Sequence, residues 1–270
     1  MKNSGRPELE AEMNFRDVDG GNGRSLVDYL DFAAKIAGVD KKRTFAAQRL
    51  AEGMSVLDAG CGTGEDVRAI AEIVSANGRV SGVDSSRTMI DEAVARGVPR
   101  NASFHTASVS ELPFEDGSFD AARAERVLQH VDDPGAAVRE LKRVVRPGGS
   151  VLVLDQDWGS LMVHGADAAT TGSILRAHRE KIANPLAGRA ARAVLRRAGL
   201  ADVSSLALVA SPPLPIAFET VLKPAMDAAI GAGSVDSGAA GRWLGALLQA
   251  DAAGEFYCGV VVVIALGMVA

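Results

Sequence analysis

From residue 54 onward, short apolar runs alternate along the chain with amphipathic stretches of helical period. The apolar runs predict strands near 54–58, 79–83, 102–106, 118–124, 150–155, 201–209 and 256–266. Alternation of strands with helices is typical of an open α/β sheet that carries helices on both faces. We therefore expect a doubly wound, Rossmann-like, seven-stranded sheet in which most strands are parallel.

Helix signals fill the intervals between these strands. After residue 64, apolar residues recur at helical spacing until Asn77-Gly78, where glycine is typical of a helix end. Asp133-Pro134 predicts an N-cap followed by proline at the first helical position, and Pro147 limits that helix. One long helix is expected over 170–198, and two further helices contain Met226 and Trp243.

The most apolar run of the chain comprises residues 258–270. Its length falls short of the roughly 17 to 25 residues of a membrane-spanning helix. The β-branched core of the run suits a strand that is buried on both faces of a sheet. We therefore predict the last internal strand here and no membrane contact.

The length and the net charge of the chain limit which classes of protein it can belong to. A chain of 270 residues with 47% hydrophobic residues is long enough for one large α/β domain. The net charge of −5 disfavours a nucleic acid as partner, although Arg189, Arg192, Arg196 and Arg197 leave a local basic face as an alternative. No apolar signal region opens the sequence, and its two cysteines form no disulfide framework, so we expect a cytoplasmic protein with reduced thiols.

A glycine-rich turn carries the clearest chemical signal. Gly60, Gly62 and Gly64 follow the first predicted strand, and Glu65-Asp66 open the next helix. Alternating glycines let the backbone approach a nucleotide closely, but two carboxylates at the helix start disfavour a pyrophosphate. Asp84 ends the second strand at the spacing of a ribose-binding acid. The turn therefore predicts a nucleoside ligand that carries positive charge.

Four ordered motifs extend this signal. Residues 57–64 read LDAGCGTG, Asp84 follows, residues 111–120 read ELPFEDGSFD, and residues 146–149 read RPGG. In these motifs the chain resembles the class I S-adenosylmethionine-dependent methyltransferases of the small-molecule type. The resemblance implies that the last strand is antiparallel and lies between the fifth and the sixth.

The resemblance also implies a set of cofactor-binding residues. They are Asp58, Gly60, Cys61, Gly62, Gly64, Asp84, Ser85, Met89, Ser108, Val109, Glu125 and, from the N-terminal region, Tyr29. At Ser108 the family commonly has an aspartate that accepts the adenine amino group. A hydroxyl accepts this bond more weakly than a carboxylate does, so reduced cofactor affinity is expected.

Three residues are candidates for catalysis: His130, His164 and Asp157. Either histidine could serve as a general base if the acceptor must lose a proton, but His130 could also be an ordinary loop residue and His164 an exposed one. Asp155 and Asp157 form a pair that could hold Mg²⁺. Since no third ligand stands nearby in the sequence, we predict no metal, with one acid capping a helix and the other facing the pocket.

These observations predict three regions: an N-terminal helical lid over 1–50, a cofactor-binding domain over 51–270, and acceptor-pocket helices within 156–250. The expected reaction is in-line methyl transfer to a small metabolite. Ala124-Glu125-Arg126-Val127 replaces the signature of amino-methylating members, which favours O- or C-methylation. The alternative is a cofactor-binding protein with a non-methylating reaction such as cyclisation. A homodimer is compatible with the sequence, which does not determine the oligomeric state.

Overall fold

The computed structural model describes residues 41–270, and in this part each of the seven predicted strands is present. The strands are β1 (Ser55–Ala59), β2 (Arg79–Asp84), β3 (Ala102–Thr106), β4 (Phe119–Glu125), β5 (Val145–His164), β6 (Ala201–Ala210) and β7 (Tyr257–Met268). The helices are α2 (Lys41–Ala47), α3 (Glu65–Val74), α4 (Arg87–Ala95), α5 (Pro134–Val144), α6 (Ala168–Glu180), α7 (Ala187–Arg197), α8 (Leu214–Ala217), the π-helix η1 (Phe218–Leu222), α9 (Lys223–Gly231) and α10 (Ser237–Ala252).

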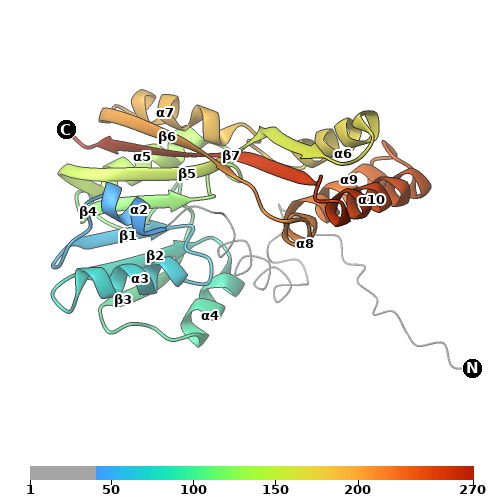
Figure 1. Cartoon of the computed structure of the whole chain (residues 1–270). Coiled ribbons are helices and arrows are strands. Elements are labelled where there is room, and N and C mark those ends of the chain that lie inside the picture. Colours follow the sequence, from blue (N-terminus) through green and yellow to red (C-terminus); the bar gives the residue numbers. More distant parts are fainter. Residues whose placement is uncertain (1–40) are drawn as a thin grey trace, which may run out of the picture.

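All seven strands belong to one sheet with the order β3-β2-β1-β4-β5-β7-β6 (Figure 1). β1 pairs in parallel with β2 and β4, and β7 pairs antiparallel with β5 and β6. The last strand therefore lies between the fifth and the sixth. The doubly wound fold and the antiparallel last strand are confirmed.

Helices pack on both faces of the sheet. On one face, α5 and α7 cover Leu57, Ala122 and Val153, which lie on three neighbouring strands. On the other face, α3 and Phe45 of α2 cover Val56 and Ala121. Successive residues of a strand point to opposite faces, so strands without polar alternation bury both sides.

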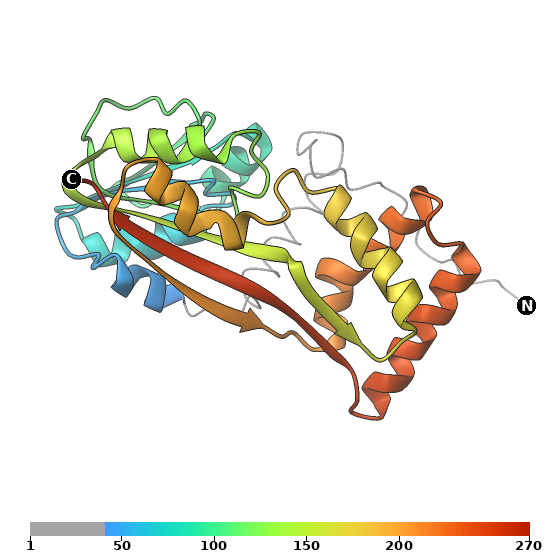
Figure 2. The same ribbon diagram turned by 90° about the horizontal axis from the view of Figure 1, so that it is seen from above.

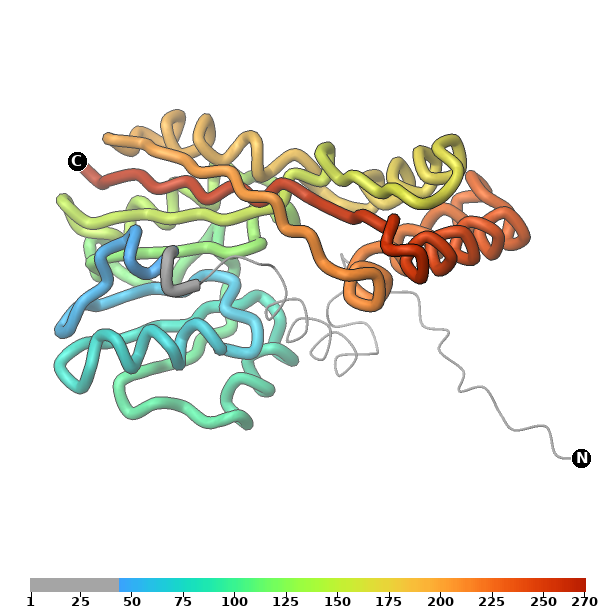
Figure 3. The backbone as a smooth tube through the Cα atoms, viewed as in Figure 1, coloured from blue at the N-terminus to red at the C-terminus, as the bar shows by residue number. Residues whose placement is uncertain are grey.

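β5 and β7 continue beyond the rest of the sheet as a two-stranded ribbon (Figures 2 and 3). β4 pairs with β5 only as far as Leu154, whereas β5 pairs with β7 from Ser150 to His164. Helices α6, α8, η1, α9 and α10 pack at the end of this ribbon around Trp243, Leu222 and Ile174. We call these helices the helical cap.

The predicted helix over 170–198 is wrong in one respect, since two helices occupy this range. α6 ends at Glu180 and α7 begins at Ala187. Pro185 lies between them, and proline restricts the residue before it to extended backbone. The other signals hold: Asp133 accepts bonds from Gly135 N and Ala136 N at the start of α5, which ends at Val144 before Pro147.

Of the expected lid over 1–50, only the last ten residues belong to the described part. There α2 docks onto the sheet: Gln48 Nε2 donates to the carbonyl of Ala122 at 2.9 Å, and Arg123 donates to Thr44 Oγ1 at 3.1 Å. No helix within residues 41–270 combines the length and the apolar character that crossing a membrane requires.

Candidate functional site

The glycine turn lies at the carboxyl end of β1. Gly60, Gly62 and Gly64 have φ values of +75°, +50° and +78°, which L-residues with side chains rarely adopt. A Cβ on Gly60 would lie 2.2 Å from Val127, and one on Gly64 would lie 2.5 Å from the ring of Phe104. Gly60 and Gly64 therefore need to be glycine for both conformation and space.

Asp84 ties this turn to the end of β2. Its carboxylate accepts from Gly62 N and from Ser86 N, each at 2.9 Å. Since each carboxylate oxygen has two lone pairs, Asp84 can accept further bonds from ligand hydroxyls while it holds the turn. Cys61 is buried beside Asp58 and Asp84, and burial followed by these charges raises the pKa of its thiol far above the ordinary value. The thiol is therefore protonated at neutral pH, and the cofactor role of Cys61 stays a prediction.

The other expected cofactor residues lie around the same edge, with differing exposure. Ser85 and Ser108 are exposed, Glu125 is half-buried, and Met89 and Val109 are buried. Ser108 Oγ accepts from Ser110 N at 3.1 Å. Tyr29 lies outside the described residues. The cofactor roles of all these residues stay predictions.

A buried cation stands beneath this edge. Arg123 of β4 is fully buried, and its guanidinium lies 3.0 Å from Asp66, 3.0 Å from Glu125 and 3.8 Å from Asp58. Its Cζ also lies 4.7 Å from the ring centroid of Phe45. Arg126 also lies 3.9 Å from Glu125, so the ion pairs of this cluster join three carboxylates to two guanidinium groups. Asp66, which the sequence placed beside the ligand, instead points to Arg123.

The loop after β4 is held by residues that are distant in sequence. Asp155 of β5 accepts from Leu128 N at 3.3 Å and from Gln129 N at 3.2 Å. Asn184, from the connection between α6 and α7, donates to the carbonyls of Leu128 and Val131. Desolvation raises the pKa of Asp155 to about 8, although the hydrogen bonds from the two amides lower it. Asp155 thus fixes the loop and caps no helix.

Within this loop, His130 contacts Gln129. The two side chains meet at 3.0 Å through Gln129 Nε2 and His130 Nε2, and Trp158 Nε1 donates to Gln129 Oε1 at 2.7 Å. His130 is exposed, and desolvation together with the nearby Arg126 lowers its pKa to about 4. At neutral pH its imidazole is therefore uncharged and weakly basic.

The remaining catalytic candidates have other partners. Asp157 is buried and accepts from Arg189 of α7 at 2.6 Å. His164 pairs with Tyr257 at the far end of the ribbon, ten residues beyond the last pair of β4 with β5. At about 3.3 Å per residue, this separation is on the order of 30 Å along the strand. The structure thus brings His130, but not His164, to the edge that carries the glycine turn.

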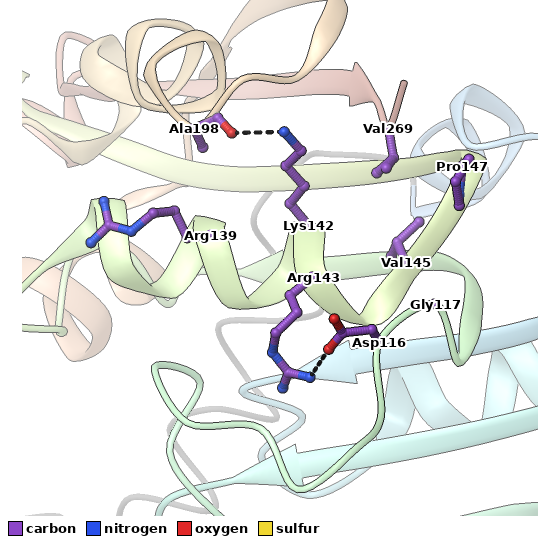
Figure 4. Close-up of a pocket in the computed structure, with 9 residues that line it drawn as sticks. All are labelled: Asp116, Gly117, Arg139, Lys142, Arg143, Val145, Pro147, Ala198 and Val269. Atoms are coloured by element: carbon purple, nitrogen blue, oxygen red, sulfur yellow. Dashed lines mark hydrogen bonds and ion pairs between the residues drawn. The ribbon is translucent and has the colours of Figure 1, made fainter.

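A further feature lies apart from this edge. A hollow of about 590 Å³ opens at the amino ends of β4 and β5, where Lys142 donates to Ala198 and Arg143 pairs with Asp116 (Figure 4). It lies at the opposite end of the parallel strands from the glycine turn.

Within residues 41–270, no group of three or more His, Cys, Asp or Glu is arranged to hold a metal ion.

Sequence reasoning missed Arg123, Gln129 and Asn184. Arginine in the central run Phe119-Asp120-Ala121-Ala122-Arg123-Ala124 was a usable signal, because arginine is rarely fully buried unless it is paired. Gln129 and Asn184 gave no such signal. Their partners lie on other elements, and only the fold brings them together.

Comparison with known proteins adds independent support. The family model described as "Methyltransferase domain" matches residues 57–153. An uncharacterized 37.1 kDa protein in transposon TN4556 of Streptomyces fradiae is 34% identical over 243 residues, which cover 87% of this chain and 68% of that protein. A ubiquinone/menaquinone biosynthesis C-methyltransferase of Hahella chejuensis is 34% identical over 119 residues, or 43% of this chain and 48% of the relative. The match thus spans about half the length of that C-methyltransferase.

Solved structures share the fold. The phosphoethanolamine N-methyltransferase 2 of Haemonchus contortus, in complex with S-adenosyl-L-methionine, superposes with a TM-score of 0.61 at 18% identity, covering 94% of this chain and 59% of that one. The cyclase SpnF superposes with a TM-score of 0.54 at 21% identity, covering 98% and 100%. Motifs, strand order and family model agree, and the chain belongs to the class I S-adenosylmethionine-dependent methyltransferases.

Proposed function

We propose that this protein transfers the methyl group of S-adenosylmethionine to an oxygen or carbon atom of a small metabolite. The observation that carries the proposal is the acidic edge of the sheet. Asp84 and Glu125 end β2 and β4, and Asp58 is the last residue but one of β1 between them. Arg123 contacts Asp58 and Glu125, and Arg126 also contacts Glu125. The excess negative charge suits the ammonium and sulfonium groups of this cofactor.

In-line displacement needs little from the protein beyond orientation and desolvation, because the sulfonium leaving group is already activated. Asp84 would hold the ribose hydroxyls, and the turn from Gly60 to Gly64 would let the cofactor lie against bare backbone. The acceptor would bind near His130, between this edge and the helical cap. The ubiquinone/menaquinone biosynthesis C-methyltransferases among the relatives support carbon as the methylated atom.

Calorimetric titration tests the cofactor half of the proposal. The wild-type protein should bind S-adenosylmethionine and S-adenosylhomocysteine with micromolar affinity and should not bind NADH. Asp84→Ala should weaken this binding by about 100-fold, since two amides and the ligand lose one acceptor. Asp91→Ala is the matched control, because Asp91 pairs with Arg87 on the exposed surface of α4.

Screening of acceptors by mass tests the reaction. Methylation adds one CH₂ unit to the acceptor and converts the cofactor to S-adenosylhomocysteine. A second candidate is cyclisation, which the fold shared with SpnF keeps in view. A product of unchanged mass with intact cofactor would favour cyclisation and contradict methyl transfer.

A further inference from the structure

Arg126 directly follows β4, at the point where the strand order of the sheet reverses between β1 and β4. In open α/β sheets, ligands bind outside the carboxyl ends of the strands at such a point. The backbone of Arg126 has a φ of +59°, and its N donates to the carbonyl of Leu154 at 2.6 Å. A long side chain is uncommon in this conformation, and such outliers gather at functional sites. Arg126 is therefore placed to contact a ligand.

The guanidinium of Arg126 is largely buried but poorly paired. Its side chain is 18% exposed, and its ion pair with Glu125 joins Nε to Oε1 at 3.9 Å, which exceeds hydrogen-bond distance. Arg123 already holds the same carboxylate at 3.0 Å. A guanidinium offers five N–H donors in a planar fork, and within residues 41–270 those of Arg126 meet no hydrogen-bond acceptor. Because a desolvated cation needs a partner, an anionic ligand would complete this site.

Gln156 of β5 is a second polar side chain without a hydrogen-bond partner. Its amide oxygen is buried, and its amide forms no hydrogen bond within the described part of the chain. Leu154 is the last residue of β5 that pairs with β4, opposite Glu125, so Gln156 lies about 7 Å beyond the end of this pairing. Since side chains alternate along a strand, Gln156 shares a face with Glu125, which contacts Arg126. Both unpartnered groups thus flank the end of β4.

We propose that Arg126 and Gln156 bind the acceptor and select one that carries a carboxylate group. This inference rests on the proposed function and names its substrate class. A carboxylate accepts two parallel hydrogen bonds from a guanidinium fork, and the amide of Gln156 bonds a second polar group of the acceptor. A phosphate carries more negative charge than a carboxylate, so Asp58, Asp84 and Glu125 at the same edge disfavour it.

NMR titration of the protein saturated with S-adenosylhomocysteine tests the carboxylate site. The probes are acetate, benzoate and 4-hydroxybenzoate, and benzamide is the uncharged match of benzoate. The Nε–H signal of Arg126, assigned by its loss in Arg126→Met, should shift with at least one carboxylate but not with benzamide. Arg126→Met should weaken binding of that carboxylate by about tenfold or more. Arg126→Lys keeps the charge without the fork and should restore only part of the affinity.

Gln156→Met tests the second residue. Because the amide forms no hydrogen bond within the described residues, its removal should leave the unfolding midpoint unchanged or raise it. The same variant should weaken binding of the carboxylate probe by about threefold or more. A lower midpoint with unchanged binding would instead assign Gln156 to packing and contradict its proposed role. Arg87→Met is the matched control and should keep wild-type binding, since Arg87 pairs with Asp91 on the exposed surface of α4.

Two results would overturn the proposal directly: an Arg126 signal that responds to none of the carboxylates, or equal affinity of the wild type and Arg126→Met for them. A third concerns the carboxylate of the cofactor itself. If Arg126→Met lost affinity for S-adenosylhomocysteine but not for methylthioadenosine, which lacks a carboxylate, Arg126 would belong to the cofactor site and the proposal would be wrong.

Failure of this inference and failure of the proposed function give different results. Methylation of uncharged acceptors at equal rates by the wild type and Arg126→Met would refute the inference and keep the function. If the protein binds no S-adenosylhomocysteine or methylates no acceptor, the proposed function fails. The same probes, titrated into the cofactor-free protein, then decide whether Arg126 binds a carboxylate.

Discussion

The glycine turn after β1 and the loop after β4 lie at the same edge of the sheet but are built differently. Gly60 N and Cys61 N donate to the carbonyl of Val83 on the adjacent strand, and the turn is shaped by glycines at positive φ. The loop after β4 is held by side chains of Asp155, Trp158 and Asn184, which come from other elements. The turn is shaped by its own glycine backbone and by bonds to the neighbouring strand β2, whereas the loop depends on side chains from β5 and from the α6–α7 connection.

This difference explains how the two regions can vary. The turn tolerates few residues because its backbone conformation carries the function. The loop depends on partners that are spread over β5 and the α6–α7 connection, so its geometry can change when any of them changes. The following variants separate the two regions.

Removal of Arg123 should have the largest effect, because this residue contacts acids from both regions. Arg123→Met should lower the free energy of unfolding by about 3–5 kcal/mol, since it leaves three carboxylates without their shared cation. Denaturant unfolding measures this loss. Arg87→Met breaks an exposed pair with Asp91 and should cost about 0.5 kcal/mol or less. Equal losses for the two variants would contradict the assigned importance of the buried cluster.

Gly60→Ala breaks the turn alone. We expect a loss of about 3 kcal/mol from backbone strain and from the contact with Val127, together with loss of cofactor binding. Gly53→Ala is the matched control, because Gly53 has a φ of +85° but open space around it. It should lose about 1–2 kcal/mol and keep cofactor affinity. Cofactor binding by Gly60→Ala at wild-type strength would show that the turn is more adaptable than its geometry indicates.

Asn184→Ala breaks the loop after β4. Loss of two hydrogen bonds to Leu128 and Val131 should cost about 2 kcal/mol. Turnover of the acceptor should fall while cofactor affinity stays within about twofold, since the turn after β1 shares none of these bonds. Asn77→Ala, which removes an exposed bond to Glu52, serves as the control. A parallel fall in cofactor affinity would show that the two regions are coupled.

His178 gives the smallest effect and reports on the support of Trp158, against whose ring it packs edge-on at 4.8 Å between centroids. Burial lowers the pKa of His178 to about 4 from 6.5, so the unfolded chain takes up a proton before the folded protein does. Stability is therefore full above pH 6.5 and is lost as pH falls toward 4. Between pH 6.5 and 5.5 the loss from this residue should be about 1 kcal/mol. His178→Phe should remove this part of the pH dependence, and an unchanged profile would contradict it.

The sequence predicted the sheet well because strands such as β1 and β7 contain compact runs of apolar residues. The turn was equally predictable, because backbone positions with positive φ favour glycine, as at Gly60, Gly62 and Gly64. Asp155 illustrates the limit. It was expected to cap a helix or face the pocket, but it bonds two loop amides that lie more than 25 residues earlier in the chain.

Likewise, the helix predicted over 170–198 is divided because the break around Pro185 supplies Asn184 to the loop after β4. His164 was proposed for its place after the fifth strand, but the extension of β5 carries it away from the edge. Strand length is set here by pairing with β7, which local sequence does not reveal.

The β5–β7 ribbon has a consequence for how such proteins diversify. The chain leaves the sheet for the helical cap twice, once between β5 and α7 and once between β6 and β7 (Figure 2). Both cap segments can be lengthened or replaced beyond the pair Asp157–Val261 without changing the order or the pairing of the strands in the rest of the sheet. Natural recombination or engineering can therefore replace the helical cap with a different acceptor-binding segment while the sheet and the glycine turn stay unchanged.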